Sequence, residues 1–141
     1  MDISQIIEAI SHRLQERFGD DYKRYINELP QTVETPAFFI QFLKLEHTPQ
    51  ISGRARITLF FNVKYFPLNG QLEAADRALQ IQRTLKEITL QDETVLLAKG
   101  SYSELVDGIA HNFMYFDFLL QDEEESALME SLYIKERNDS H

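Results

Sequence analysis

Cysteine is absent from this 141-residue chain. Without thiols it can form no disulfide, no thiolate metal site and no cysteine nucleophile. No unbroken apolar run approaches the roughly 20 residues that a membrane-spanning helix needs. Acidic Asp2 stands where a secretory leader would carry positive charge. We therefore expect a soluble chain that has no membrane partner and does not follow the general secretory route.

Basic residues are in the minority, 14 against 23 acidic ones, and the formal net charge is −9. Binding to nucleic acid without sequence preference needs a basic face, so this balance argues against DNA or RNA as the main partner. Residues 122–141 alone hold seven acids and two bases. We expect one domain over residues 1–121 and an acidic C-terminal tail or arm over 122–141. Such a segment is most simply solvated, and its alternative use is to grip a basic partner.

Residues that would carry chemistry are few and scattered. The five glycines form no glycine-rich phosphate loop. The four histidines have neither metal-ligand nor catalytic spacing. Glu73 and Asp76 lie three residues apart near the start of a predicted helix, a position more typical of complementing the helix dipole than of binding a metal. The sequence therefore predicts no catalytic, cofactor-binding or metal-binding residue, and no enzyme.

The spacing of apolar residues predicts two amphipathic helices. The first covers residues 3–18, with Asp2 or Ser4 as its cap and Gly19 at its end. The second covers about residues 71–90, and its broad apolar stripe comprises Leu72, Ala74, Ala75, Ala78, Leu79, Ile81, Leu85 and Ile88.

The remaining apolar segments predict strands, over residues 22–26, 37–45, 55–66, 94–106 and 109–120. The second of these is expected to be mostly buried on both faces, with a loop over 47–53 after it, and the third alternates with period two. Asp107-Gly108 between the last two is a strong hairpin signal, and Gly100 is expected at a bulge. The fold class is therefore α+β: an antiparallel sheet of about four strands with two helices packed on one face. A weak helical pattern continues at Leu128, Met129, Leu132 and Tyr133.

Two short motifs indicate a family. Residues 34–40 read ETPAFFI, and the strand that starts near Arg54 ends in Tyr65-Phe66-Pro67. With the N-terminal helix, the second helix and the hairpin, this arrangement resembles small tail proteins encoded in prophages of Gram-positive bacteria. The resemblance covers roughly residues 3–120 and is to the tail terminators, or tail-completion proteins, of long-tailed phages.

The resemblance implies a structural protein that forms a ring, commonly a hexamer, on the last ring of the tail tube. Its implied partners are its own copies, the tail tube protein and the head–tail connector protein. Its implied location is the virion tail, and the host cytoplasm during assembly. DNA would pass through the lumen unbound, beside a negative wall. Residues 47–56 would then face the lumen or a neighbouring subunit. The candidate interface residues are His47, Gln50, Arg54, Arg56, Phe60, Asp107 and Tyr115.

Three other functions stay open at this stage. A neck or head–tail adaptor protein would share the fold and differ in its partner. A cytoplasmic acidic protein-binding module would use residues 122–141 on a basic partner. A small enzyme would need a cleft with convergent polar groups.

Overall fold

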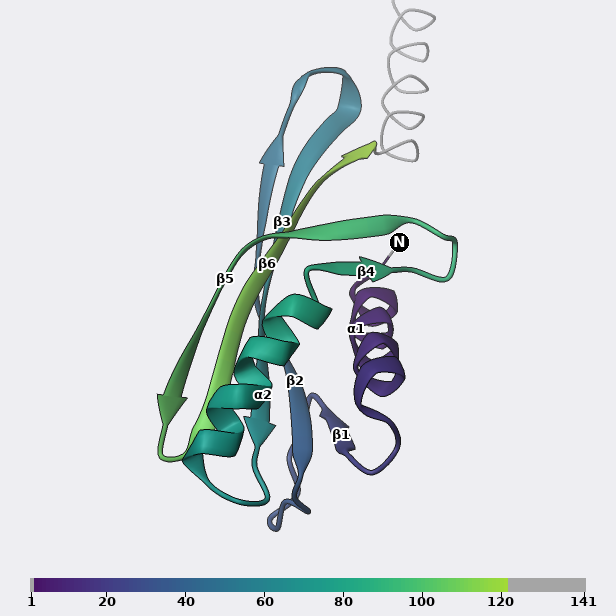
Figure 1. The fold of residues 1–141 in the computed structure, drawn as a ribbon. Helices are drawn as coiled ribbons and strands as arrows, with labels where there is room; N and C mark the ends of the chain where they lie inside the picture. The colour runs from purple at the N-terminus through teal and green to yellow at the C-terminus, as the bar shows by residue number, and fades with distance from the viewer. Residues whose placement is uncertain (1, 122–141) are drawn as a thin grey trace, which may run out of the picture.

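The computed structural model describes residues 2–121 and has two helices against one face of a curled six-stranded sheet (Figure 1). The strand order is β1-β2-β3-β6-β5-β4, and every neighbouring pair is antiparallel except β1–β2. The α+β prediction with helices on one face is confirmed. The sheet has six strands instead of about four: the short strand predicted at residues 22–26 forms one edge, and a short strand that was not predicted, at residues 87–89, forms the other. The elements are α1 (Ile3–Phe18), β1 (Lys23–Ile26), β2 (Ala37–Pro49), a 3₁₀ turn (Ile51–Gly53), β3 (Arg54–Phe66), α2 (Gln71–Thr84), β4 (Glu87–Thr89), β5 (Val95–Val106) and β6 (Ile109–Gln121).

Helix α1 has the predicted bounds. Asp2 caps it: its side chain accepts a hydrogen bond from the Gln5 amide, and the Gln5 side chain accepts one from the Asp2 amide. Such a capping box satisfies two amides that the first helical turn leaves unpaired. Gly19 ends the helix with a φ of 86°, a conformation that glycine adopts readily. The buried stripe is Ile6, Ile7, Ala9, Ile10 and Leu14.

Helix α2 is shorter than predicted, because it ends at Thr84 instead of residue 90. Ile88 is still buried, but as part of β4, where it pairs with Leu96 of β5. The β-branched pair Ile88-Thr89 favours this edge strand over another helical turn. Leu72 and Leu79 were expected in the apolar stripe and are instead exposed; the core uses Ala74, Ala78 and Ile81.

Strand β3 follows the predicted alternation, and β6 beside it alternates in the same way. Asp107 and Gly108 both have positive φ, 52° and 79°, so the hairpin turn between β5 and β6 is confirmed. The register shifts between Ala98 and Gly100, which confirms the bulge. The helix-facing side of the two strands consists of Ala55, Ile57, Leu59, Phe61, Val63, Tyr65, Ala110, Asn112, Met114 and Phe116.

Strand β2 differs from its prediction in two ways. Only Ala37–Ile40 is buried on both faces, and the strand is exposed from Leu43 onward. The predicted loop over 47–53 is wrong at its start, because His47–Pro49 pairs with β3. Pro49 is compatible with a strand here since β1 covers β2 only as far as Ile40, which leaves the rest of β2 as a free edge that needs no amide from proline.

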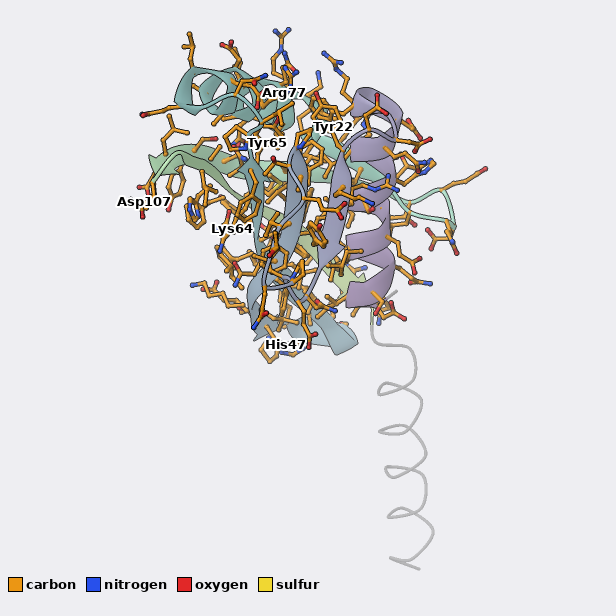
Figure 2. All side chains as sticks on the ribbon, turned by 90° about the horizontal axis from the view of Figure 1, so that it is seen from below. Tyr22, His47, Lys64, Tyr65, Arg77 and Asp107 are labelled. Carbon is orange, nitrogen blue, oxygen red and sulfur yellow. The ribbon has the colours of Figure 1, made fainter. Side chains whose placement is uncertain are left out.

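An aromatic cluster joins the helices to the sheet. Figure 2 shows Tyr22, Tyr65 and Arg77 close together beside α2. Arg77 Nε donates to the Tyr22 hydroxyl at 3.2 Å, and the Tyr65 hydroxyl donates to Glu73 Oε2 at 2.9 Å. Burial and this hydrogen bond raise the pKa of the Tyr65 hydroxyl above its usual range. Glu73 lies in the first turn of α2, where its charge complements the helix dipole as expected.

Candidate protein–protein interface

A projecting arm is the most distinctive surface of the molecule. It comprises residues 43–58, which are the outer half of the β2–β3 hairpin, and residues 117–121 at the end of β6. Figure 1 shows the hairpin extending past the helices, with the end of β6 beside it. Arg56 pairs with Leu119 and Arg54 with Gln121, so the arm has three strands over part of its length.

Side-chain contacts hold the arm in one conformation. Arg54 Nε donates to Gln121 Oε1 at 3.3 Å, and Gln121 Nε2 donates to the Ser52 carbonyl at 3.2 Å. Arg56 Nη1 lies 3.0 Å from both carboxylate oxygens of Asp117. These contacts tie the turn and β3 to β6. An arm held in this way loses little conformational entropy when it binds.

The arm also exposes apolar side chains. Ile51, at the tip, is 89% exposed. The sequence prediction missed the exposed Leu43 and Leu45 because it expected residues 37–45 to be mostly buried on both faces. The alternation of charged and apolar residues from Lys44 onward is the signal that could have revealed a half-exposed strand. The other exposed apolar residues of the arm are Leu43, Leu45, Leu119 and Leu120.

The sheet face opposite the helices carries a groove of about 560 Å³ next to the arm. Its aromatic lining comes from three strands: Phe60 and Tyr115 lie 5.4 Å apart between ring centroids, and Tyr102 stacks on Phe113 at 5.0 Å. The Lys44 ammonium lies 4.4 Å from the centre of the Phe60 ring. The groove therefore combines apolar area with a polar rim, as protein-binding surfaces do.

The structure brings six of the seven predicted interface residues to this side of the molecule. His47, Gln50, Arg54 and Arg56 belong to the arm, and Phe60 and Tyr115 line the groove. Asp107 lies apart from them, in the β5–β6 turn at the other end of β6. Figure 2 shows His47 and Asp107 well separated at the periphery.

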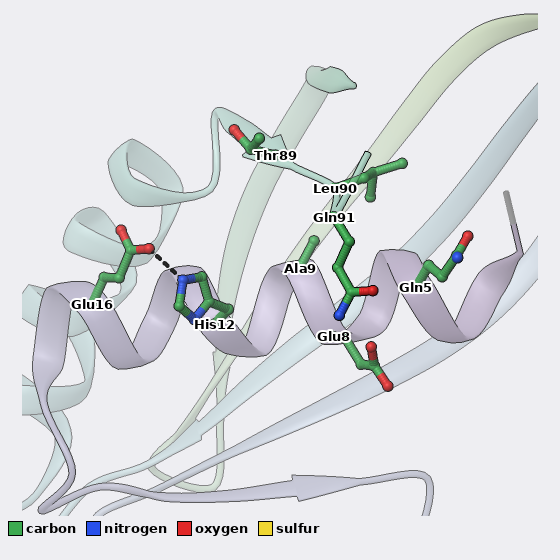
Figure 3. Close-up of a pocket in the computed structure, with 8 residues that line it drawn as sticks. All are labelled: Gln5, Glu8, Ala9, His12, Glu16, Thr89, Leu90 and Gln91. Atoms are coloured by element: carbon green, nitrogen blue, oxygen red, sulfur yellow. Dashed lines mark ion pairs between the residues drawn. The ribbon is translucent and has the colours of Figure 1, made fainter. Parts of the chain in front are cut away.

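Within residues 2–121 no three His, Asp or Glu side chains gather as a metal site would require. Figure 3 shows a hollow of about 430 Å³ between α1 and the turn after β4. Its titratable pair, His12 and Glu16, lies 2.6 Å apart one helical turn from each other, and both side chains are more than half exposed. His12 thus faces solvent. His111 and Asp117, both on β6, have different partners. Asp117 forms an ion pair with Arg56, and His111 Nδ1 lies 3.1 Å from Asn62 Nδ2.

The described residues contain no helix long and apolar enough to cross a bilayer. The arm and the aromatic groove are surfaces typical of one class of protein, the small structural modules that bind other proteins.

The sequence matches the phage tail terminator protein family over residues 5–127, and the chain belongs to this family. No curated protein matches the chain. Members of this family are structural proteins of the virion tail that terminate the tail tube, and they are not enzymes. The prediction of a tail terminator without catalytic activity is confirmed.

Proposed function

We propose that the chain ends the tail tube as a closed ring of its own copies, with six as the expected number. The observation that carries this proposal is the projecting arm. Its apolar tip is exposed, and because the arm continues β2 and β3 outward, it cannot fold back onto the groove of its own subunit. A surface that fits a different surface on the next copy produces heterologous contacts, and these generate a ring when the rotation closes.

In this ring, the arm of one subunit lies in the aromatic groove of its neighbour. Ile51 and Leu45 would bury apolar area against Phe60, Tyr102 and Tyr115. Burial of apolar surface gives roughly 25 cal/mol per Å², so a few such side chains per interface contribute several kcal/mol. Arg54 and Gln50 would lie at the rim of this contact. Polar groups at the rim contribute more to the relative orientation of the two subunits than to their binding affinity.

The two faces of the ring would have different partners. One face binds the last ring of the tail tube, and the other is offered to the head–tail connector. The negative net charge of the chain would allow DNA to pass through the lumen without binding. During assembly the free subunit would be located in the host cytoplasm. The motifs at residues 34–40 and 65–67 favour a prophage of a Gram-positive host as its source.

Mass measurement tests the ring. Native mass spectrometry and sedimentation of the full chain, alone and with purified tail tubes, should give a single closed oligomer on or beside the tube. Ile51→Asp should abolish it. Leu72→Asp is the matched control, because Leu72 is also a highly exposed apolar residue but lies on α2 away from the arm. Only monomers beside tail tubes, or equal effects of the two variants, would contradict the proposal.

A separate experiment tests the connector. Immobilised wild-type chain is incubated with tube protein and, in parallel, with connector protein. We expect retention of both. Retention of the connector alone would favour a neck adaptor, the alternative open from the sequence.

A further inference from the structure

A basic groove lies between the two helices, on the opposite side of the sheet from the aromatic groove. Its volume is about 600 Å³. Arg13 and Arg17 come from α1, and Arg83 and Lys86 come from the end of α2 and the residues that follow. Glu16 is the one acid in the lining. Four positive charges thus face one negative charge, in a chain whose net charge is −9.

The positive charge of this groove is little compensated by its surroundings. Glu16 is already shared, since its carboxylate lies 2.6 Å from His12 Nε2 and 3.6 Å from Arg13 Nη1. Arg13 Nε donates to the Thr84 carbonyl at 3.2 Å, which fixes the groove between the helices. Among the described residues, Arg17, Arg83 and Lys86 take part in no ion pair. Clefts lined by one sign of charge concentrate ligands of the opposite sign.

We infer that the acidic segment 122–141 docks in the basic groove of its own chain. Charge complementarity identifies this occupant: seven acids against two bases, with four consecutive acids at residues 122–125. Its length is sufficient. Ala98 N donates to the Lys86 carbonyl at 2.9 Å, and Ala98 pairs with Phe116, so the five residues of β6 up to Gln121, about 17 Å, separate Lys86 from the start of the segment. Residues 122–125 extend up to about 13 Å beyond Gln121.

Docking would neutralise a surface that otherwise attracts phosphate groups. A tail protein assembles in the presence of nucleic acid, and four clustered bases bind DNA without sequence preference through counterion release. The acidic segment would occupy these bases. The contact lies near the protein surface, so salt should weaken it strongly.

Zero-length carbodiimide cross-linking of the full chain, followed by peptide mass spectrometry, tests the inference. Lys86 should couple to carboxylates of residues 122–125 at least fivefold more often than Lys44, which is exposed on β2 and lines the aromatic groove on the opposite face of the sheet. The Lys86 product should fall severalfold in 0.5 M NaCl. It should also fall severalfold in the double variant Arg17→Gln/Arg83→Gln, while Lys64→Gln, which removes a positive charge outside the groove lining, should leave it unchanged.

Mixing ¹⁴N- and ¹⁵N-labelled chains shows which copy supplies the segment, and the inference requires products within one chain. Products only between chains would assign the groove to a neighbouring subunit and overturn it. Equal coupling of Lys86 and Lys44 would also overturn it. So would wild-type binding of duplex DNA at 0.15 M salt that Arg17→Gln/Arg83→Gln removes, because the groove would then be open to phosphates.

Discussion

The ring of Tyr115 on β6 lies against Gly100 on β5. A Cβ atom at position 100 would stand 2.7 Å from Tyr115 Cε1, closer than real Cβ contacts allow. The glycine is therefore required here by space. The contact coincides with the bulge between Ala98 and Gly100, and both residues of the pair line or adjoin the aromatic groove.

Replacing Gly100 by Ala should destabilise the protein. Gly→Ala at an unstrained site normally stabilises by about 0.4–1 kcal/mol, but displacing the Tyr115 ring should reverse the sign and cost about 1–2 kcal/mol. Urea unfolding followed by circular dichroism measures the difference. Adding Tyr115→Ala should recover part of the loss, whereas Lys99→Ala should change little. A Gly100→Ala variant as stable as wild type would show that the ring moves freely.

A second pair on the same sheet face, Asn62 and His111, should make stability depend on pH. Asn62 Nδ2 lies 3.1 Å from His111 Nδ1, so the neutral imidazole accepts the hydrogen bond at Nδ1. Burial and the nearby Lys64 charge lower the pKa of His111 below its ordinary value of 6.5. A protonated ring would carry a hydrogen on Nδ1 and lose this bond to Asn62.

The stability of the protein should therefore fall as the pH drops below about 6.5. In the window between the lowered pKa and the ordinary one, the unfolded chain binds a proton at His111 that the folded chain does not. Above this window the contribution of His111 is constant. The difference in unfolding free energy between wild type and His111→Gln, measured by urea unfolding from pH 7.5 to 5, should shift against wild type on acidification. Parallel pH profiles would contradict the role of His111.

A buried polar network links α2 to three strands. Asn112 is fully buried; its Nδ2 donates to the Val63 carbonyl at 2.8 Å, and the Ser103 hydroxyl donates to its Oδ1 at 2.6 Å. Gln82 Nε2 in turn donates to Ser103 Oγ at 2.8 Å.

Asn112→Ala should cost about 3 kcal/mol, because it leaves the Val63 carbonyl unpaired and opens a cavity. Gln82→Ala, at the outer end of the network, should cost less than about 1 kcal/mol. Thermal and urea unfolding of the two variants would test this gradient. Equal losses would contradict the central place of Asn112 in the network.

The sequence predicted the elements whose signals are local. The cap and end of α1 depend on Asp2 and Gly19, and the β5–β6 turn depends on Asp107-Gly108, so neighbouring residues suffice to recognise them. The alternation of β3 likewise reflects which face meets the helices. These predictions need no knowledge of distant contacts.

The features that the sequence did not reveal depend on distant pairing. Ile88 lies in β4 and not in α2 because it pairs with Leu96 of β5. Residues 47–49 form a strand because β3 continues outward beside them, which composition alone does not indicate. Their exposure, and that of Ile51, arises because neither α1 nor α2 extends over this end of the hairpin (Figure 1). The sequence therefore identified residues of the arm, namely His47, Gln50, Arg54 and Arg56, as interface candidates. It predicted a loop where the structure has strand residues 47–49. The interface role of the arm stays a prediction.

The Arg56–Asp117 ion pair should have a small but measurable coupling energy. One Arg56 nitrogen contacts both carboxylate oxygens, and the Asp117 side chain is only 21% exposed. A double-mutant cycle of Arg56→Ala and Asp117→Ala should give about 0.5–1 kcal/mol at low salt, whereas the more exposed Lys23–Glu34 pair, 3.4 Å apart, should give close to zero. Equal coupling in the two pairs would contradict this difference.

The same variants separate two roles of Arg56 in assembly. If Arg56 only holds the arm to β6, then Arg56→Ala and Asp117→Ala should reduce oligomer formation equally, and the double variant should reduce it no further. If Arg56 also contacts the neighbouring subunit, its variant should be the more severe, since removing Asp117 leaves the guanidinium available to the partner. Sedimentation of the three variants at matched concentration distinguishes these outcomes.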